Sequence, residues 1–216
     1  MKTLKLYIIS AFGILFSLIF SFEISKAETV ICEPDCFDTP FIREHPLSDT
    51  FCIGNCCFVA DYYIRKACHI WCDIMLWRIR VLTPNCNIYD AKTLCDIAEA
   101  QIIHTLINDY IENGVNSIWY QVTQTEICIP RAPGECTYFW RVRKATCWKF
   151  YLNPDWGSYP TYWGAYSYCL YDYCCLTWYQ VCMDQFAQII VTQVESQTPH
   201  DCPTQSGMED CVQVCD

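Results

Sequence analysis

The sequence lacks the short motifs that usually identify an enzyme. It contains no G-x-S-x-G, no H-E-x-x-H, no phosphate-binding loop and no G-x-G-x-x-G. Its four histidines lie in unrelated contexts, and His104 falls within a predicted helix, where we interpret it as a partly buried structural side chain. These absences predict a non-enzymatic protein without cofactor or metal. An enzyme of unrecognised type is the third alternative, after a structural protein and a carbohydrate-binding or adhesive protein.

The cysteine spacing lacks the pattern of a redox or zinc site. Disulfide oxidoreductases and structural zinc sites commonly use C-x2-C, and this sequence has none. Four C-x3-C pairs occur instead, among 19 cysteines in 216 residues. In an exported chain such a density is typical of a disulfide framework formed in an oxidising compartment.

Positive charge is also scarce. Lys and Arg together number 14 against 24 Asp and Glu, which gives a net charge of −10. A chain this acidic repels nucleic acid and anionic lipid, so we expect neither as a partner. There is no Asn-x-Ser/Thr sequon, which fits bacterial export.

The first 27 residues have the pattern of an export signal. Lys2 and Lys5 precede an apolar run over residues 6–22, and Ser25-Lys26-Ala27 fits a small-x-small cleavage site. A retained membrane anchor is the alternative, although the run is slightly short for a spanning helix. Cleavage after Ala27 removes three Lys and one Glu, which makes the net charge −12. We therefore predict a secreted protein, extracellular or in the bacterial periplasm or on the cell surface, with no membrane contact after cleavage.

All the cysteines lie beyond the predicted signal, and their number is odd. Nine bridges leave one thiol, either free or paired with another chain, and the sequence does not give the connectivity. The disulfide candidates are Cys32, Cys36, Cys52, Cys56, Cys57, Cys68, Cys72, Cys86, Cys95, Cys128, Cys136, Cys147, Cys169, Cys174, Cys175, Cys182, Cys202, Cys211 and Cys215.

Two stretches repeat the same order of features. Residues 56–86 and residues 174–202 each begin with a Cys pair, continue through two β-favouring runs, and end in Thr-Pro and a Cys. Within the first run Phe58, Ala60 and Tyr62 alternate with more polar side chains, which is typical of a half-buried strand. The sequence therefore predicts two related β-hairpins stapled at their bases, unless the abundance of cysteine produced the likeness by chance.

The remaining segments complete a predicted α+β fold. Residues 28–51 contain three prolines and are expected to form an extended arm. A four-residue apolar spacing between Asp90 and Gly114 predicts an amphipathic helix. Strands are predicted over residues 117–129, 137–144 and 148–152. We expect one disulfide-stapled domain over residues 52–216, with an antiparallel sheet of six or seven strands and one long helix packed on it.

Aromatic residues are concentrated between positions 156 and 179. Tyr and Trp combine a large apolar area with a polar group, which suits interfaces and sugar-binding surfaces. The segment is interpreted as a lid on the core, a subunit interface or a glycan platform. The candidate interface or ligand residues are Trp156, Tyr159, Tyr162, Trp163, Tyr166 and Tyr168.

These features predict a secreted structural protein that assembles with itself into a surface or fibre. Open sheet edges accept another strand, so an arm donated by a neighbouring subunit and locked by the odd cysteine is one route. An arm folded back on its own domain, with one inert buried thiol, is the competing interpretation. An adhesin or carbohydrate-binding module that uses the aromatic segment is the second function we expect.

Overall fold

In the computed structural model, a long curled sheet forms the largest part of the described chain. The structure describes residue 41 and residues 46–87, 89–152, 163–169, 174–197, 201–202 and 210–215. The chain divides into two units, Met1–Val30 and Ile31–Asp216. All described residues belong to the second unit, so the predicted signal over residues 1–27 and most of the arm lie outside them.

The second unit contains nine described strands and three helical segments. Their bounds are β1 (Leu47–Ile53), β2 (Cys56–Ala67), β3 (Trp71–Val81), α2 (Ala91–Asn113), η1 (Gly114–Asn116), α3 (Ile118–Thr123), β4 (Cys136–Ala145), β5 (Cys147–Leu152), β6 (Gly164–Tyr168), β7 (Cys174–Met183), β8 (Ile189–Gln197) and β9 (Val212–Gln213).

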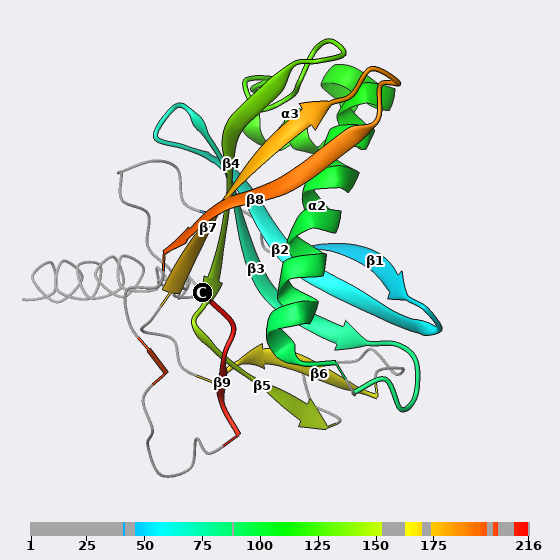
Figure 1. Cartoon of the computed structure of the whole chain (residues 1–216), viewed down its shortest axis with the longest axis vertical. Coiled ribbons are helices and arrows are strands. Elements are labelled where there is room, and N and C mark those ends of the chain that lie inside the picture. The colour runs from blue at the N-terminus through cyan, green and yellow to red at the C-terminus, as the bar shows by residue number, and fades with distance from the viewer. Residues whose placement is uncertain are drawn as a thin grey trace, which may run out of the picture. The chain divides into compact units, whose positions relative to one another are not determined.

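The predicted fold class is wrong in its balance and its topology. Strands make up 49% of the described residues and helices 22%, and the sheet curls into a half-barrel (Figure 1). The order is β8-β7-β4-β3-β6-β5-β9, with β2 attached to β3 and β1 attached to β2. The fold is therefore a curled sheet with a long helix and two short helical segments. It is not a set of antiparallel hairpins that carries one long helix.

The pairing of β3 with β4 is parallel, so the prediction of an antiparallel sheet is wrong at this place. Cys72–Met75 of β3 aligns with Trp140–Arg143 of β4, while Arg78–Val81 of β3 pairs antiparallel with β6. Parallel neighbours need a long crossover connection, and α2, η1 and α3 all lie between these two strands. The helical crossover therefore provides the long connection that lets these two neighbouring strands run in the same direction.

The strand predicted over residues 117–129 is instead a helical turn followed by loop. Ser117 caps α3 by accepting a hydrogen bond from the Tyr120 backbone N–H at 3.2 Å. Trp119 is fully buried and its ring packs on Trp140, with centroids 4.8 Å apart. The β-favouring residues of this segment thus fill the core from a helix, because tertiary packing outweighs local propensity.

The long helix begins and ends where its sequence predicts. Asp90 accepts a hydrogen bond from the Thr93 backbone N–H at 2.8 Å, and Gly114 ends the helix with a φ of +55°. The helix contacts β8, β3, β1 and β5, and in Figure 1 it lies along the curled sheet. His104 lies on its partly exposed side, with Nδ1 2.9 Å from the Asn108 side-chain nitrogen.

Both stretches that share the repeated order contain an antiparallel hairpin. β2 pairs with β3, and β7 pairs with β8. The β2–β3 turn places Cys68 and His69 at φ values of +50° and +63°, with the Ile70 N–H bonded to the Ala67 carbonyl, as in a type I′ turn. The right-handed twist of that turn type favours a tight hairpin.

The described end of the arm folds back on its own domain. Leu47–Ile53 forms β1 and pairs with Cys56–Tyr62 of β2. Phe41 is buried, and its ring lies 4.1 Å from the guanidinium carbon of Arg65. For these residues the structure therefore favours the folded-back interpretation over donation to a neighbouring subunit.

Candidate functional site

The first candidate feature is the disulfide framework. Seven bridges join described cysteines: Cys52–Cys57, Cys56–Cys86, Cys72–Cys128, Cys136–Cys182, Cys147–Cys202, Cys169–Cys211 and Cys175–Cys215. Cys68 and Cys174 are also disulfide-bonded. Cys32 and Cys36 lie outside the described residues. The chain is therefore disulfide-rich, which is typical of proteins folded in an oxidising compartment.

Some of the bridges join directly paired strands, and others join the sheet to the C-terminal segment. Cys52–Cys57 and Cys136–Cys182 each join residues that face one another in paired strands, with Cα atoms 4.1 and 4.0 Å apart. Three others link β5, the end of β6 and β7 to the C-terminal segment that contains residues 202, 211 and 215. Among the described residues of that segment, the two-residue strand β9 and the bond from the Val214 N–H to the Thr146 carbonyl are its backbone ties to the rest of the fold, so the three bridges add strongly to its attachment.

The two hairpins are not stapled in the same way. Cys56–Cys86 closes the base of β2–β3, as the repeat predicts. In the second stretch, Cys202 pairs with Cys147 of β5, and Cys175 pairs with Cys215. The repeated sequence order therefore specifies strands in both places, while the disulfide connectivity follows which elements are neighbours in space.

One described cysteine is free, and it is buried. Cys95 lies on the inner side of α2 with no exposed surface. Burial raises the pKa of its thiol well above the usual value, so the reactive thiolate is strongly disfavoured. A covalent joint between subunits through Cys95 is incompatible with this position.

The buried carboxylate of Asp73, in the β2–β3 hairpin, binds three arginines. Asp73 has no exposed surface, and its oxygens accept hydrogen bonds from Arg65 at 2.5 Å and from Arg141 and Arg143 at 3.2 Å. The Arg141 guanidinium also lies over the Trp71 ring at 4.9 Å. Strand β2 is thus buried on both faces, whereas its alternation predicted one polar, solvated face.

A second buried carboxylate, Asp61 of the neighbouring strand β2, is bound by arginines in a similar way. Asp61 accepts hydrogen bonds from Arg78 at 2.5 Å, from Arg80 at 2.6 Å and from the Ser48 hydroxyl at 2.6 Å. Tyr62 donates to Asp49 at 2.8 Å, and burial raises the pKa of Asp49. These bonds connect β1, β2 and β3 by side chains in addition to the backbone ladder.

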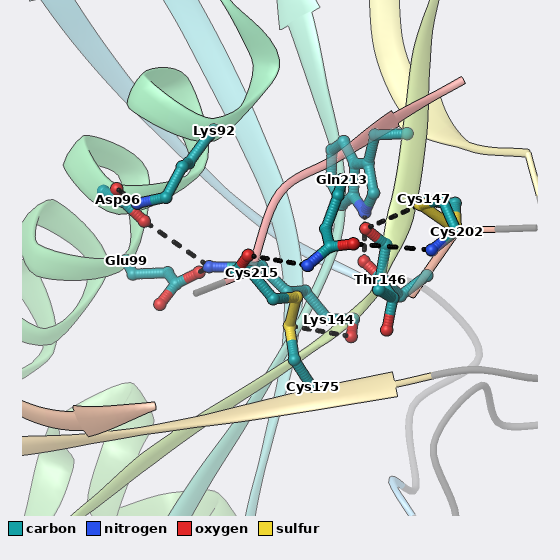
Figure 2. The surroundings of a disulfide bond; sticks show 12 residues. Lys92, Asp96, Glu99, Lys144, Thr146, Cys147, Cys175, Cys202, Gln213 and Cys215 are labelled. Atoms are coloured by element: carbon teal, nitrogen blue, oxygen red, sulfur yellow. Dashed lines mark hydrogen bonds and ion pairs between the residues drawn. A yellow bond between two sulfur atoms is a disulfide. The ribbon is translucent and has the colours of Figure 1, made fainter. Parts of the chain in front are cut away.

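A third charged cluster lies between α2 and the sheet. Lys144 of β4 donates to Glu99 of α2, and its Nζ lies 3.6 Å from an Asp96 oxygen. Tyr179 of β7 donates to the other Glu99 oxygen at 2.7 Å. Figure 2 shows the Lys144 ammonium group between Glu99 and Asp96, above the Cys175–Cys215 bridge. Burial raises the pKa of Glu99, because the charged form is poorly solvated there.

The outer strand β8 is the most exposed part of the sheet. It occupies one end of the strand order, and among the described residues no strand pairs with its outer side. Ile190 and Val194 are 49% and 57% exposed, and Phe186 in the preceding turn is 74% exposed. Only one of its nine residues, Glu195, carries a charge. A β-favouring and exposed edge with so little charge is a typical site for strand addition.

The candidate aromatic residues do not form one described surface. Trp156, Tyr159 and Tyr162 lie outside the described residues. Trp163 is 54% exposed, whereas Tyr166 is buried and donates to the Tyr89 carbonyl at 2.8 Å. Tyr168 is half-buried, and its hydroxyl lies 3.4 Å from the Trp77 indole nitrogen. The segment thus contributes to the core through Tyr166 and to the surface through Trp163.

Two further findings concern the described part of the chain only. There, no group of three or more His, Cys, Asp or Glu side chains is arranged to hold a metal ion. No helix among the same residues has the length and apolar character needed to span a membrane.

Sequence reasoning missed the three buried charge clusters and the exposed edge. The charged residues alternate with apolar ones along the strands, which is the pattern of a solvated face. An excess of Arg on β3 and β4 opposite single acidic residues was the available signal. Comparisons with protein-family models, with curated proteins and with solved structures each found no match to this chain.

Proposed function

We propose that this chain is an exported, non-enzymatic structural protein that assembles with copies of itself along the outer side of β8. The observation that carries the proposal is the exposure of this strand together with the lack of charge over its residues 189–194. The disulfide framework supports durability outside the cell, since each unstrained bridge contributes about 2–4 kcal/mol.

The second copy is the partner that fits this edge best. Two mature chains, each with a net charge of −12, repel each other over most of their surfaces, so their contact has to avoid charge. Antiparallel pairing of two β8 strands brings the uncharged run 189–194 of each copy together. Backbone hydrogen bonds then provide affinity, and Ile190 and Val194 provide apolar contact.

The assembly proposed here is non-covalent, in contrast to the joint expected from the odd cysteine. Cys95 is the free thiol among the described cysteines, and it is buried beneath α2. The described end of the arm is already paired as β1, so β8 replaces the arm as the proposed contact.

The test is the size of the mature protein over a range of concentrations. Light scattering after size-exclusion chromatography, with electron microscopy, should show species larger than the monomer that increase with concentration. Replacing Ile190 and Val194 with Lys places charge at the edge and should leave a folded monomer. Ile70→Lys in the β2–β3 turn is the matched control, because Ile70 is 41% exposed and lies away from β8. A wild-type protein that stays monomeric at all concentrations would contradict the proposal.

Carbohydrate binding is the second candidate, and Trp163 is the observation that favours it. An exposed indole stacks readily on a sugar ring. A glycan array comparing the wild type with Trp163→Ala tests this function: a signal lost in the variant supports it, and the absence of any wild-type signal rejects it.

A further inference from the structure

The cluster between α2 and β4 holds an amine and a carboxyl group away from water, beside a second carboxyl group, Asp96, that is partly exposed. The Lys144 side chain is 2% exposed and the Glu99 side chain has no exposed surface. Lys144 Nζ is hydrogen-bonded to Glu99 Oε1 and lies 3.6 Å from Asp96 Oδ1, while Tyr179 donates to Glu99 Oε2 at 2.7 Å. Every one of these groups comes from a regular element, so the backbone fixes their relative positions.

We propose that Lys144 and Glu99 condense into an intramolecular amide, which joins β4 covalently to α2. The proposal does not depend on the assembly of the protein or on its location. It assigns a self-catalysed modification to a pair that would otherwise be a buried salt bridge. The bond links residues 45 positions apart in the sequence and, unlike a disulfide, it resists reduction.

Burial is what changes the chemistry of this pair. Two opposite charges lose much of their solvation in such a site, and proton transfer from the ammonium to the carboxylate gives a neutral amine and a neutral acid. Burial raises the pKa of Glu99, which agrees with this direction, while the charges of Glu99 and Asp96 raise the pKa of Lys144 against the effect of its burial. The neutral pair is therefore the minor, reactive form of a site that rests mainly as an ion pair. A neutral amine is a nucleophile, and a protonated carboxyl is an electrophile, so desolvation activates both partners together.

The surrounding groups have the positions that the condensation requires. The lone pair of Lys144 Nζ attacks Glu99 Cδ, and Oε2 takes the developing negative charge within reach of the Tyr179 hydroxyl. Asp96 accepts a proton from the attached nitrogen and delivers it to the departing Oε1 hydroxyl. A C–N bond forms, a C–O bond breaks, and one water leaves. The two groups are held in contact by the fold, which supplies the effective concentration.

Peptide mapping of the full-length exported protein tests the bond directly. After complete reduction and alkylation, the measured mass of the wild-type chain should be one water lower than the mass calculated from its sequence with every cysteine alkylated. Trypsin cuts after free lysine, so the amide should leave Lys144 uncut and join residues 93–131 to residues 144–149 in one branched peptide. Fragmentation should place the branch on Glu99.

Three variants separate the proposed roles. Lys144→Arg keeps the charge and should abolish the mass loss completely. Lys92→Arg is the matched control, because Lys92 also bonds Asp96, at 3.0 Å, and this variant should retain the branched peptide. Tyr179→Phe should slow the accumulation of the branched form in a time course of refolding.

Two outcomes would overturn the inference. A wild-type digest that contains unlinked peptides 93–131 and 145–149, at the full sequence mass, shows that the pair is only a salt bridge. A branch located on Asp96 shows that the assignment of Glu99 as the acyl group is wrong. Since the wild-type digest decides both, the test remains decisive even where Lys144→Arg fails to fold.

Discussion

The β2–β3 and β7–β8 hairpins share a sequence order, yet they occupy opposite environments. The first lies within the sheet, where β3 has β2 on one side and both β4 and β6 on the other. The second ends the strand order, and β8 exposes most of its side chains. The comparison teaches that the pattern of a strand specifies its conformation, while its number of neighbours determines whether it acts as core or as surface.

The charged residues show the same difference. In the first hairpin, Asp61 and Asp73 are fully enclosed and are bound by arginines from several strands. In the second, Asp184 lies in the turn and accepts bonds from the backbone N–H groups of Phe186 and Gln188 at 2.8 Å, and Glu195 is exposed. Buried charges are costly to leave unpaired, so substitutions in the two hairpins should have very different effects.

The largest difference is expected for the buried carboxylate. Asp73→Ala leaves Arg65 buried without its carboxylate, which should lower the free energy of unfolding by about 3–5 kcal/mol. Glu195→Ala on β8 is the matched control and should change it by less than about 0.5 kcal/mol. Denaturant unfolding of both variants measures the contrast. Equal losses in the two variants would contradict the distinction between core and edge hairpins.

A smaller effect is expected from the staple of the first hairpin. Replacing Cys56 and Cys86 together with Ala should cost about 2–4 kcal/mol, because the bridge no longer restricts a 30-residue separation in the unfolded chain. Limited proteolysis should then cut within residues 56–86 before it cuts within residues 174–197. Cys95→Ala removes a thiol but no covalent link, and its cleavage pattern should match the wild type.

The smallest effect concerns Tyr166 of β6, which borders the first hairpin. Tyr166→Phe removes the bond to the Tyr89 carbonyl and should cost about 1 kcal/mol at neutral pH. Burial raises the pKa of Tyr166 to about 12, against 10 for an ordinary tyrosine. The stability from this hydroxyl is therefore fully present below pH 10 and is lost as the pH rises towards 12.

Unfolding curves at several alkaline pH values provide the measurement. The difference in stability between the wild type and Tyr166→Phe should shrink between pH 10 and pH 12. A difference that stays constant over this interval would show that the Tyr166 hydroxyl titrates normally in the folded protein.

Local features were predictable where they depend on neighbours in the sequence. The caps of α2 follow from Asp90 and Gly114, since capping uses backbone groups within the same turn. The strands from residue 136 to residue 152 follow from alternation and β-favouring side chains. The apolar stripe of α2 is also largely confirmed, with Leu94, Ile102 and Leu106 buried.

Other predictions failed because the deciding contacts are distant in the sequence. Residues 118–123 have strand-favouring side chains but form a helix, since this places Trp119 against Trp140 in the core. The polar side of β2 was expected to face water, and instead Arg65 meets Asp73 inside the protein. The proposed edge at β8 was not identified, because an edge strand and a central strand have the same local pattern.

The sequence by itself determined the oxidised, cysteine-rich character of the chain, the helix boundaries and most strands, because composition and short-range geometry are sufficient for these. Only the tertiary structure decided the parallel β3–β4 pair, the seven described bridges and the meeting of Lys144 with Glu99. The physical reason is that pairing partners and buried charges are selected by which surfaces come together, and those surfaces belong to residues far apart along the chain.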